Sequence, residues 1–243
     1  MSVHVEHHDH VAVVSLARPP ANAMTTASLY EVAETFERLG GDDRTAAIVL
    51  TGEGRSFSAG LDLREIGDDA GDQEALIEAL NRAFLAVYSC PKLVVAAING
   101  HAIAGGLILA LCADVRLAAD TRLKAGLAEV RVGVVYPVGA LEVVRCELAP
   151  HVARRLVLTG DNVDAATAVA LGVFDRLVDA DTLAPTAISL AANHPPPIGF
   201  ARIKAQLRSD AVARMRAVIG GNDPLPRPWL TDETFAAAAA ALR

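Results

Sequence analysis

Short apolar runs rich in β-branched residues alternate with segments of helical periodicity, and this alternation restricts the possible folds of the chain more than any other feature. The runs at 11–16, 46–51 and 93–98 are bounded by turn residues, as is typical of buried strands. Between them, the segments 25–39 and 72–88 place apolar side chains on one helical face. Strands that alternate with helices in this way predict an α/β layer architecture.

The second half of the chain changes character near residue 180. Further strands are expected at 115–117 and 174–178, and none afterwards. We therefore divide the chain into a core over 1–180 and a helical region over 181–243. The amphipathic segments of that region have no strands of their own to cover, so they are expected to pack on the core or on another subunit. Gly220 and Gly221, with the prolines that follow, are the best candidate for a mobile connection.

Composition excludes several classes of protein. With 52% hydrophobic and 21% charged residues, the chain is not expected to be disordered. A net charge of −7 disfavours general nucleic-acid binding and binding to anionic membranes. No targeting signal or membrane-spanning run is visible, so a cytoplasmic protein is expected. Cys90, Cys112 and Cys146 are far apart and odd in number, which favours buried thiols in a reducing compartment.

Two glycine-containing loops follow predicted strands. The first is SFSAGLDL at 56–63, and the second is NGHAIAGG at 99–106. The run after Gly106 has no polar face, so its helix should be buried all round. A helix that begins with glycine offers bare N–H groups to an anion or to a polarised carbonyl oxygen, although a tight packing turn is the alternative interpretation. The dinucleotide fingerprint, the P-loop and the GxSxG motif are all absent from the sequence.

The two loops resemble the oxyanion loops of the crotonase family, the enoyl-CoA hydratase/isomerase superfamily. The segments RPPANA at 18–23, GLAE at 126–129 and ATAVALGVFDRLV at 166–178 extend the resemblance over most of the chain. The resemblance implies a crotonase-like ββα spiral core over 1–180, and a C-terminal region over 181–243 that mediates trimerisation and pocket closure. The motifs are most similar to those of mitochondrial-type Δ3,Δ2-enoyl-CoA isomerases.

One departure from the family pattern bears on the reaction. Hydratases of this family use two glutamates, and the corresponding positions here are Ile108 and Glu129. Water addition needs both acids, whereas a 1,3-proton shift needs one base. The resemblance thus implies isomerisation of an enoyl-CoA through a dienolate, with Glu129 as base and the N–H groups of Leu61 and Gly105 as the oxyanion hole. Two alternatives remain open: hydration or another crotonase reaction that uses Glu142 or another carboxylate, and an acyl-CoA-binding protein without catalysis.

The resemblance also implies a coenzyme A thioester as substrate, with no bound cofactor and no metal. Apolar neighbours such as Ile108 are expected to raise the pKa of Glu129 by desolvation, unless Glu129 is an ordinary surface acid. Asp62 is interpreted as a cap of the helix that follows the first loop. Candidate residues for binding substrate and coenzyme A are Arg18, Ala23, Ser58, Ala59, Gly60, Asp62, Ile108 and Lys204.

Several other polar residues admit two interpretations. The N-terminal histidines invite a metal site, but without a carboxylate or cysteine partner they are expected to be solvated. His101 either contacts ligand or only forms a hydrogen bond, and Tyr136 is a candidate for the acyl pocket. Glu142 is placed on the surface of an amphipathic helix, with a second acid as the alternative. The histidines are His4, His7, His8 and His10, and the cluster Arg202, Lys204 and Arg208 is either a phosphate site or a solvated helix face.

Overall fold

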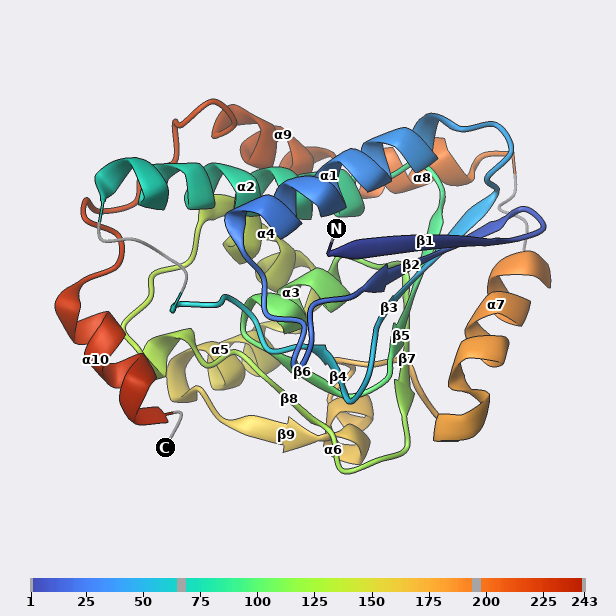
Figure 1. Ribbon diagram of the computed structural model, residues 1–243. Coiled ribbons are helices and arrows are strands. Elements are labelled where there is room, and N and C mark those ends of the chain that lie inside the picture. Colours follow the sequence, from blue (N-terminus) through green and yellow to red (C-terminus); the bar gives the residue numbers. More distant parts are fainter. Residues whose placement is uncertain (1, 65–68, 194–197, 242–243) are drawn as a thin grey trace.

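Two sheets form the framework of the computed structural model, which describes residues 2–64, 69–193 and 198–241 (Figure 1). The larger sheet has six strands, of which only the edge pair β1 and β2 is antiparallel. In spatial order its strands are β1 (Val3–His8), β2 (Val11–Leu16), β3 (Ala47–Gly52), β5 (Leu93–Ile98), β7 (Val115–Ala119) and β10 (Arg176–Val178). The smaller sheet has β4 (Ser56–Ser58), β6 (His101–Ile103), β8 (Lys124–Gly126) and β9 (Asn162–Asp164).

Helices cover the sheets and fill the C-terminal region, so the α/β layer architecture expected from the sequence is confirmed. No strand of the described residues follows β10, as predicted. The helices are α1 (Thr26–Gly41), α2 (Ala70–Tyr88), α3 (Gly105–Leu111), α4 (Val138–Glu147), α5 (Pro150–Thr159), α6 (Ala165–Ala170), α7 (Leu183–Asn193), α8 (Phe200–Leu207), α9 (Ser209–Ala217) and α10 (Asp232–Ala241), with short 3₁₀ turns η1 (Glu129–Arg131) and η2 (Ala180–Thr182).

The central strands of the larger sheet are buried on both faces. All six residues of β5 are buried, as a parallel strand covered on both sides requires. Alternate residues of the strands therefore enter two cores. One core packs against α1 and α2, and the other, smaller core packs against α7 on the opposite face (Figure 1).

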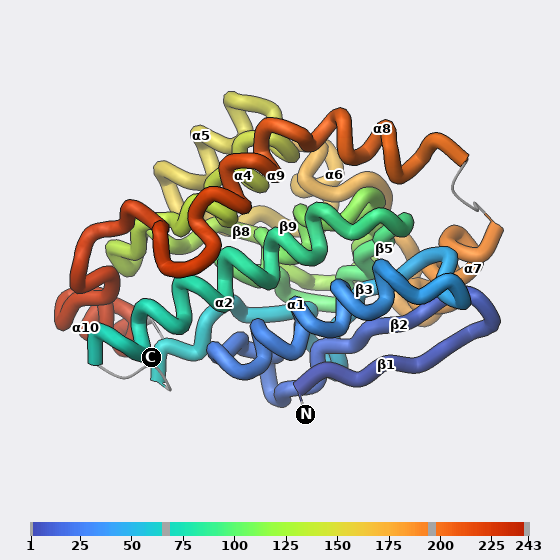
Figure 2. Tube along the Cα trace, turned by 90° about the horizontal axis from the view of Figure 1, so that it is seen from above, coloured from blue at the N-terminus to red at the C-terminus, as the bar shows by residue number. Residues whose placement is uncertain are grey.

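The long helices begin and pack as their sequences predict. The Thr25 hydroxyl caps α1 by accepting a hydrogen bond from the Ser28 N–H, and the Ser28 hydroxyl accepts one from the Thr25 N–H. The apolar face of α1 packs against α2, which lies beside it (Figure 2). All seven residues of α3 are buried, which confirms a helix buried all round.

The glycine- and proline-containing segment after α9 was expected to be a mobile connection. Its contacts show instead that it is anchored to the core. Oδ2 of Asp223 accepts hydrogen bonds from the Asn81 side-chain amide at 2.8 Å and from the Val138 N–H at 2.9 Å. The Gln73 amide accepts from the N–H groups of Trp229 and Leu230, both at 2.9 Å. These contacts fix the path of the chain between α9, which packs against α2 and α4, and α10 (Figure 2).

Three observations concern the remaining expectations. Cys90 and Cys112 are buried as expected, but Cys146 is exposed, which corrects the prediction for that thiol. No helix within the described ranges is long and apolar enough to cross a membrane. Among the same residues, no group of three or more His, Cys, Asp or Glu side chains is arranged to hold a metal ion. The N-terminal histidines lie on or beside β1, where His4 contacts Glu53 at 2.7 Å.

Candidate active site

A cavity of about 720 Å³ lies where the two glycine loops meet α2, α3, η1 and the C-terminal segment. Its wall is mostly apolar and includes side chains from the core and from α10. A concave apolar site with a few convergent polar groups is the usual form of a small-molecule site. The wall includes Ala23, Ala59, Leu61, Asp62, Arg64, Gly105, Ile108, Glu129, Val134, Tyr136, Trp229, Phe235, Ala238 and Ala239.

The two loops lie side by side because β4 pairs with β6 in parallel. Glycine is required where their backbones touch. A Cβ atom on Gly106 would lie 2.3 Å from the Ser58 carbonyl oxygen, and one on Gly60 would lie 3.0 Å from the Ile103 carbonyl oxygen. Gly60 also has a φ of +86°, which favours glycine. The loops therefore approach each other as closely as their backbones permit. They are tight packing turns, as the alternative interpretation expected, and residues of both also line the cavity.

The backbone hydrogen bonds leave the N–H groups of Leu61 and Gly105 outside the local bonding pattern. Met24 donates to the Gly60 carbonyl and accepts from the Asp62 N–H, so the polar groups of Leu61 point to the opposite side. Gly105 is the first residue of α3, and its N–H therefore has no acceptor within the helix. The turn before it is made by Ala104, whose φ is +52°. Leu61 and Gly105 both line the cavity, and among the described residues neither backbone N–H has an acceptor in the elements that flank it.

Glu129 opens η1 and lines the same cavity, and only 8% of its surface is exposed. Ile108 and Val134 line the wall with it. Burial raises the pKa of Glu129 to about 7, and a hydrogen bond from Tyr136 opposes that rise. The Tyr136 hydroxyl donates to Oε2 of Glu129 at 2.8 Å. The expectation of a raised pKa is confirmed, and the alternative of a surface acid is wrong.

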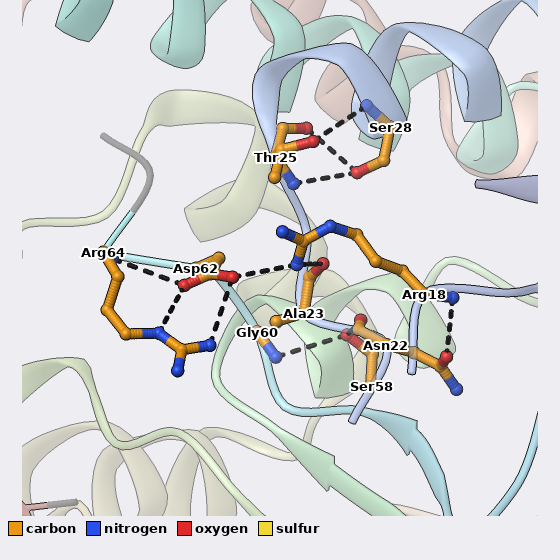
Figure 3. A network of polar contacts seen from close by, with 9 residues as sticks. All are labelled: Arg18, Asn22, Ala23, Thr25, Ser28, Ser58, Gly60, Asp62 and Arg64. Atoms are coloured by element: carbon orange, nitrogen blue, oxygen red, sulfur yellow. Dashed lines mark hydrogen bonds and ion pairs between the residues drawn. The ribbon is translucent and has the colours of Figure 1, made fainter. Parts of the chain in front are cut away.

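Asp62 holds two arginines, Arg18 and Arg64 (Figure 3). Its Oδ2 accepts from Nη1 of Arg18 at 2.8 Å, and its Oδ1 accepts from Nε of Arg64 at 3.0 Å. The hydrogen bond from Arg64 and then that from Arg18 hold the pKa of the carboxyl below its usual range. The expected helix cap is therefore wrong for Asp62, because Asp69 caps α2. Both arginines line a second hollow of about 440 Å³ that shares residues with the main cavity.

The segment at 18–23 is fixed to the first loop by Asn22. The side-chain amide of Asn22 donates to the backbone carbonyl oxygens of Glu53 and Ser56. The backbone carbonyl of Asn22 accepts from the Ser58 hydroxyl at 2.8 Å. The Ser58 hydroxyl in turn accepts from the Gly60 N–H at 3.2 Å (Figure 3). Ser58 is completely buried behind the cavity wall, so its contribution is to shape the loop. Ala23 and Ala59 line the cavity directly, as predicted for substrate-binding residues.

Lys204 lies elsewhere, and its assignment to coenzyme A is corrected. Its ammonium is buried and donates to the Asp114 carboxylate at 2.7 Å and to the Lys92 carbonyl at 3.2 Å. The neighbouring Arg208 is also buried and is paired with Glu147 at 3.2 Å. Only Arg202 of this predicted cluster is exposed. Lys204 and Arg208 thus neutralise the half-buried carboxylates of Asp114 and Glu147, and of this cluster Arg202 alone lies on a solvated helix face.

Two further polar predictions have clear outcomes. Glu142 is 4% exposed and pairs with Arg214 at 2.7 Å, so its predicted surface position is wrong. It does not line the cavity, which removes the support for its use as a second acid. His101 accepts a hydrogen bond from the Lys124 N–H at 3.0 Å and is likewise not part of the cavity wall.

Sequence reasoning missed three parts of the site. Arg64 directly follows the first loop motif, and its charge beside Asp62 was the available signal. Trp229 and Phe235 form part of the cavity wall although they are more than 100 residues from the loops in sequence. Their aromatic character within a polar, proline-containing segment was the only signal, and it does not indicate which surface they cover. Tyr136 was a candidate for the pocket, and the structure confirms that it lines the cavity.

Known proteins are similar in both sequence and structure. Residues 6–223 match the family model described as enoyl-CoA hydratase/isomerase. The chain is 35% identical over 198 residues to a probable enoyl-CoA hydratase, EchA17, of Mycobacterium tuberculosis, which covers 80% of this chain and 76% of the relative.

Two solved structures extend the comparison. Pseudomonas aeruginosa DspI superposes with a TM-score of 0.80 at 30% identity, covering 90% of this chain and 91% of the other. An enoyl-CoA isomerase of M. tuberculosis superposes with a TM-score of 0.83 at 28% identity, covering 91% and 97%.

Proposed function

The chain belongs to the enoyl-CoA hydratase/isomerase family, and we propose that within it this protein moves the double bond of an enoyl-CoA from C3 to C2. The observation that supports this reaction is that Glu129 and Ile108 line the same cavity. An isoleucine side chain moves no proton, so the position that holds a second acid in a two-glutamate site is inert here. The other acid of the described wall, Asp62, is held by Arg18 and Arg64.

The proposed reaction proceeds in two proton transfers. The thioester oxygen of a 3-enoyl-CoA accepts hydrogen bonds from the N–H groups of Leu61 and Gly105. Glu129 removes a proton from C2, and the electron pair of that C–H bond moves onto the thioester carbonyl to give a dienolate. The same carboxyl group then delivers the proton to C4 as the electrons return, which leaves the double bond between C2 and C3. One base is sufficient because the proton taken is the proton returned.

Energetically, the site supplies what this reaction needs. Negative charge develops on the thioester oxygen in the transition state, and each backbone donor in such a hole contributes about 3–4 kcal/mol. A general base is most effective when its pKa lies near the working pH, and burial raises the pKa of Glu129 to about 7. The mostly apolar wall excludes water from the dienolate and strengthens both effects.

Hydration is the second candidate, and the description of EchA17 as a probable enoyl-CoA hydratase favours it. The two reactions are distinguished by incubating the purified protein separately with 3-enoyl-CoA and 2-enoyl-CoA. Conjugated 2-enoyl-CoA formed without 3-hydroxyacyl-CoA supports isomerisation. Rapid formation of 3-hydroxyacyl-CoA from the 2-enoyl thioester refutes it, and binding of both thioesters with neither product identifies an acyl-CoA-binding protein.

Two variants test the assignment of the groups. Glu129→Gln should abolish turnover while the affinity for the thioester stays within about twofold, because the amide keeps the shape of the side chain. Ile108→Glu places a second carboxyl in the cavity and should introduce measurable hydration. Retention of isomerase activity by Glu129→Gln would show that another group is the base.

Coenzyme A recognition and assembly complete the proposal. We propose that the phosphates of coenzyme A bind at the hollow lined by Arg18 and Arg64, where two guanidinium groups outnumber the single carboxylate of Asp62. The expected homotrimer or dimer of trimers stays a prediction, which a measurement of molar mass in solution checks.

A further inference from the structure

We propose that Tyr136 is a positioning residue for Glu129, one that fixes a single carboxylate oxygen and leaves the other to face the substrate. The inference rests on the proposed function, because it concerns the base of that reaction. Tyr136 lies in the loop between η1 and α4 and lines the cavity beside Glu129. Its hydroxyl donates to Oε2 of Glu129 at 2.8 Å.

The hydrogen bond persists in both protonation states of the base. Burial, followed by the charge of Glu129, raises the pKa of the Tyr136 hydroxyl, so it remains a donor throughout the neutral range. Oε2 accepts this bond when Glu129 is ionised, and it still accepts when the proton is on Oε1. The proton taken from C2 is therefore held on the oxygen that faces the substrate, from which it is delivered to C4.

The loop that carries Tyr136 is fixed on both sides. On its N-terminal side, the Val134 N–H donates to the Glu129 carbonyl at 3.0 Å, and the Val135 carbonyl accepts from the Trp229 indole at 2.7 Å. On its C-terminal side, the Val138 N–H donates to Asp223 at 2.9 Å. The segment after α9 thus holds the residues that flank Tyr136.

Few other charges act on Glu129. The described acid and base groups of the cavity wall besides Tyr136 are Asp62 and Arg64, which are paired with each other. On η1 itself, Arg131 is paired with Asp161 at 2.8 Å. The titratable side chains of α5, which packs against η1, are exposed: they are His151, Arg154 and Arg155. Tyr136 is therefore the side chain whose hydrogen bond lowers the pKa of Glu129 against the effect of burial.

The test is the pH dependence of kcat/KM in Tyr136→Phe, which keeps the ring and removes the hydroxyl. Loss of a hydrogen bond to a carboxylate raises its pKa by about one to two units. The acidic limb of the profile should move upward by that amount, and kcat/KM at pH 7 should fall about 5- to 50-fold as the ionised fraction decreases. A limb that coincides with that of the unmodified protein overturns the inference, whatever the height of the plateau.

Tyr30→Phe is the matched control, because Tyr30 lies on α1 and is not part of the cavity wall. Its profile should coincide with that of the unmodified protein. A second measurement does not depend on turnover: the carboxyl vibration of Glu129, identified by its loss in Glu129→Gln, is titrated by infrared spectroscopy. An unchanged midpoint in Tyr136→Phe refutes the positioning role, whereas a shifted midpoint in a protein without isomerase activity refutes only the proposed function.

Discussion

Replacing Glu129 with glutamine should stabilise the folded chain, and the gain should grow as the pH rises from 5 to 8. Burial raises the pKa of this carboxyl from its ordinary value of 4.5 to about 7. Between these two values the folded chain binds more protons than the unfolded chain, so its stability falls as the pH rises. Glutamine does not titrate, and its amide oxygen accepts the same hydrogen bond from Tyr136.

The magnitude follows from the size of the pKa difference. A difference of about 2.5 units corresponds to about 3 kcal/mol once the pH is well above 7. At pH 5 only the first part of that penalty is present, about 1 kcal/mol. Glu129→Gln should therefore raise the free energy of unfolding by about 2 kcal/mol more at pH 8 than at pH 5.

The assay is denaturant unfolding of both proteins at pH 5 and pH 8, at one protein concentration. Glu34→Gln on α1 is the control, because water solvates that exposed carboxylate in both states and the change should be the same at both pH values. If Glu129→Gln gives the same increment at both pH values, the carboxyl is not a buried acid with a raised pKa. The argument for its role as a near-neutral base would then also fail.

Three further substitutions test the framework around the site. Gly106→Ala would place a methyl group 2.3 Å from the Ser58 carbonyl oxygen, so it should lower the free energy of unfolding by about 1–3 kcal/mol and reduce turnover; an active, equally stable variant would show that the loops are not in contact. Asp223→Ala leaves the Asn81 amide and the Val138 N–H without their acceptor and should cost about 2 kcal/mol in urea unfolding, whereas an unchanged midpoint would mean that the segment is not anchored there. Lys204→Met removes a buried ion-pair partner and should cost about 3 kcal/mol, yet leave KM for the acyl-CoA within twofold; a large rise in KM would restore Lys204 as a coenzyme A ligand.

The larger sheet was predictable where burial is complete. β5 is covered on both faces and is therefore a continuous apolar run that matches the predicted 93–98 segment. β1 was missed because it is a half-exposed edge strand in which histidines alternate with Val3 and Val5. The strands of the smaller sheet have three residues each, which is too short for a period of two to be recognised.

The buried charges were not predictable, because a sequence shows a charge but not its partner. Lys204 pairs with Asp114, 90 residues away, and Glu142 pairs with Arg214. In both cases the local pattern of an amphipathic helix favours solvent, since charged side chains are rarely buried without a partner. By contrast, Glu129 was identified because its position relative to the two loops is part of a family motif.

The match to the family model ends at residue 223, yet residues beyond that point also form part of the cavity wall that contains Glu129. Trp229, Phe235, Ala238 and Ala239 line the cavity from the segment beyond that match. Desolvation is the largest cause of the raised pKa of Glu129, so the groups that exclude water from the cavity also set the strength of the base. Trp229 acts twice, because it covers the cavity and its indole holds the Val135 carbonyl next to Tyr136. The motifs thus identify Glu129 as the acid. The C-terminal segment contributes to the wall that excludes water from its carboxyl group, and it holds the loop that carries Tyr136, the hydrogen-bond donor.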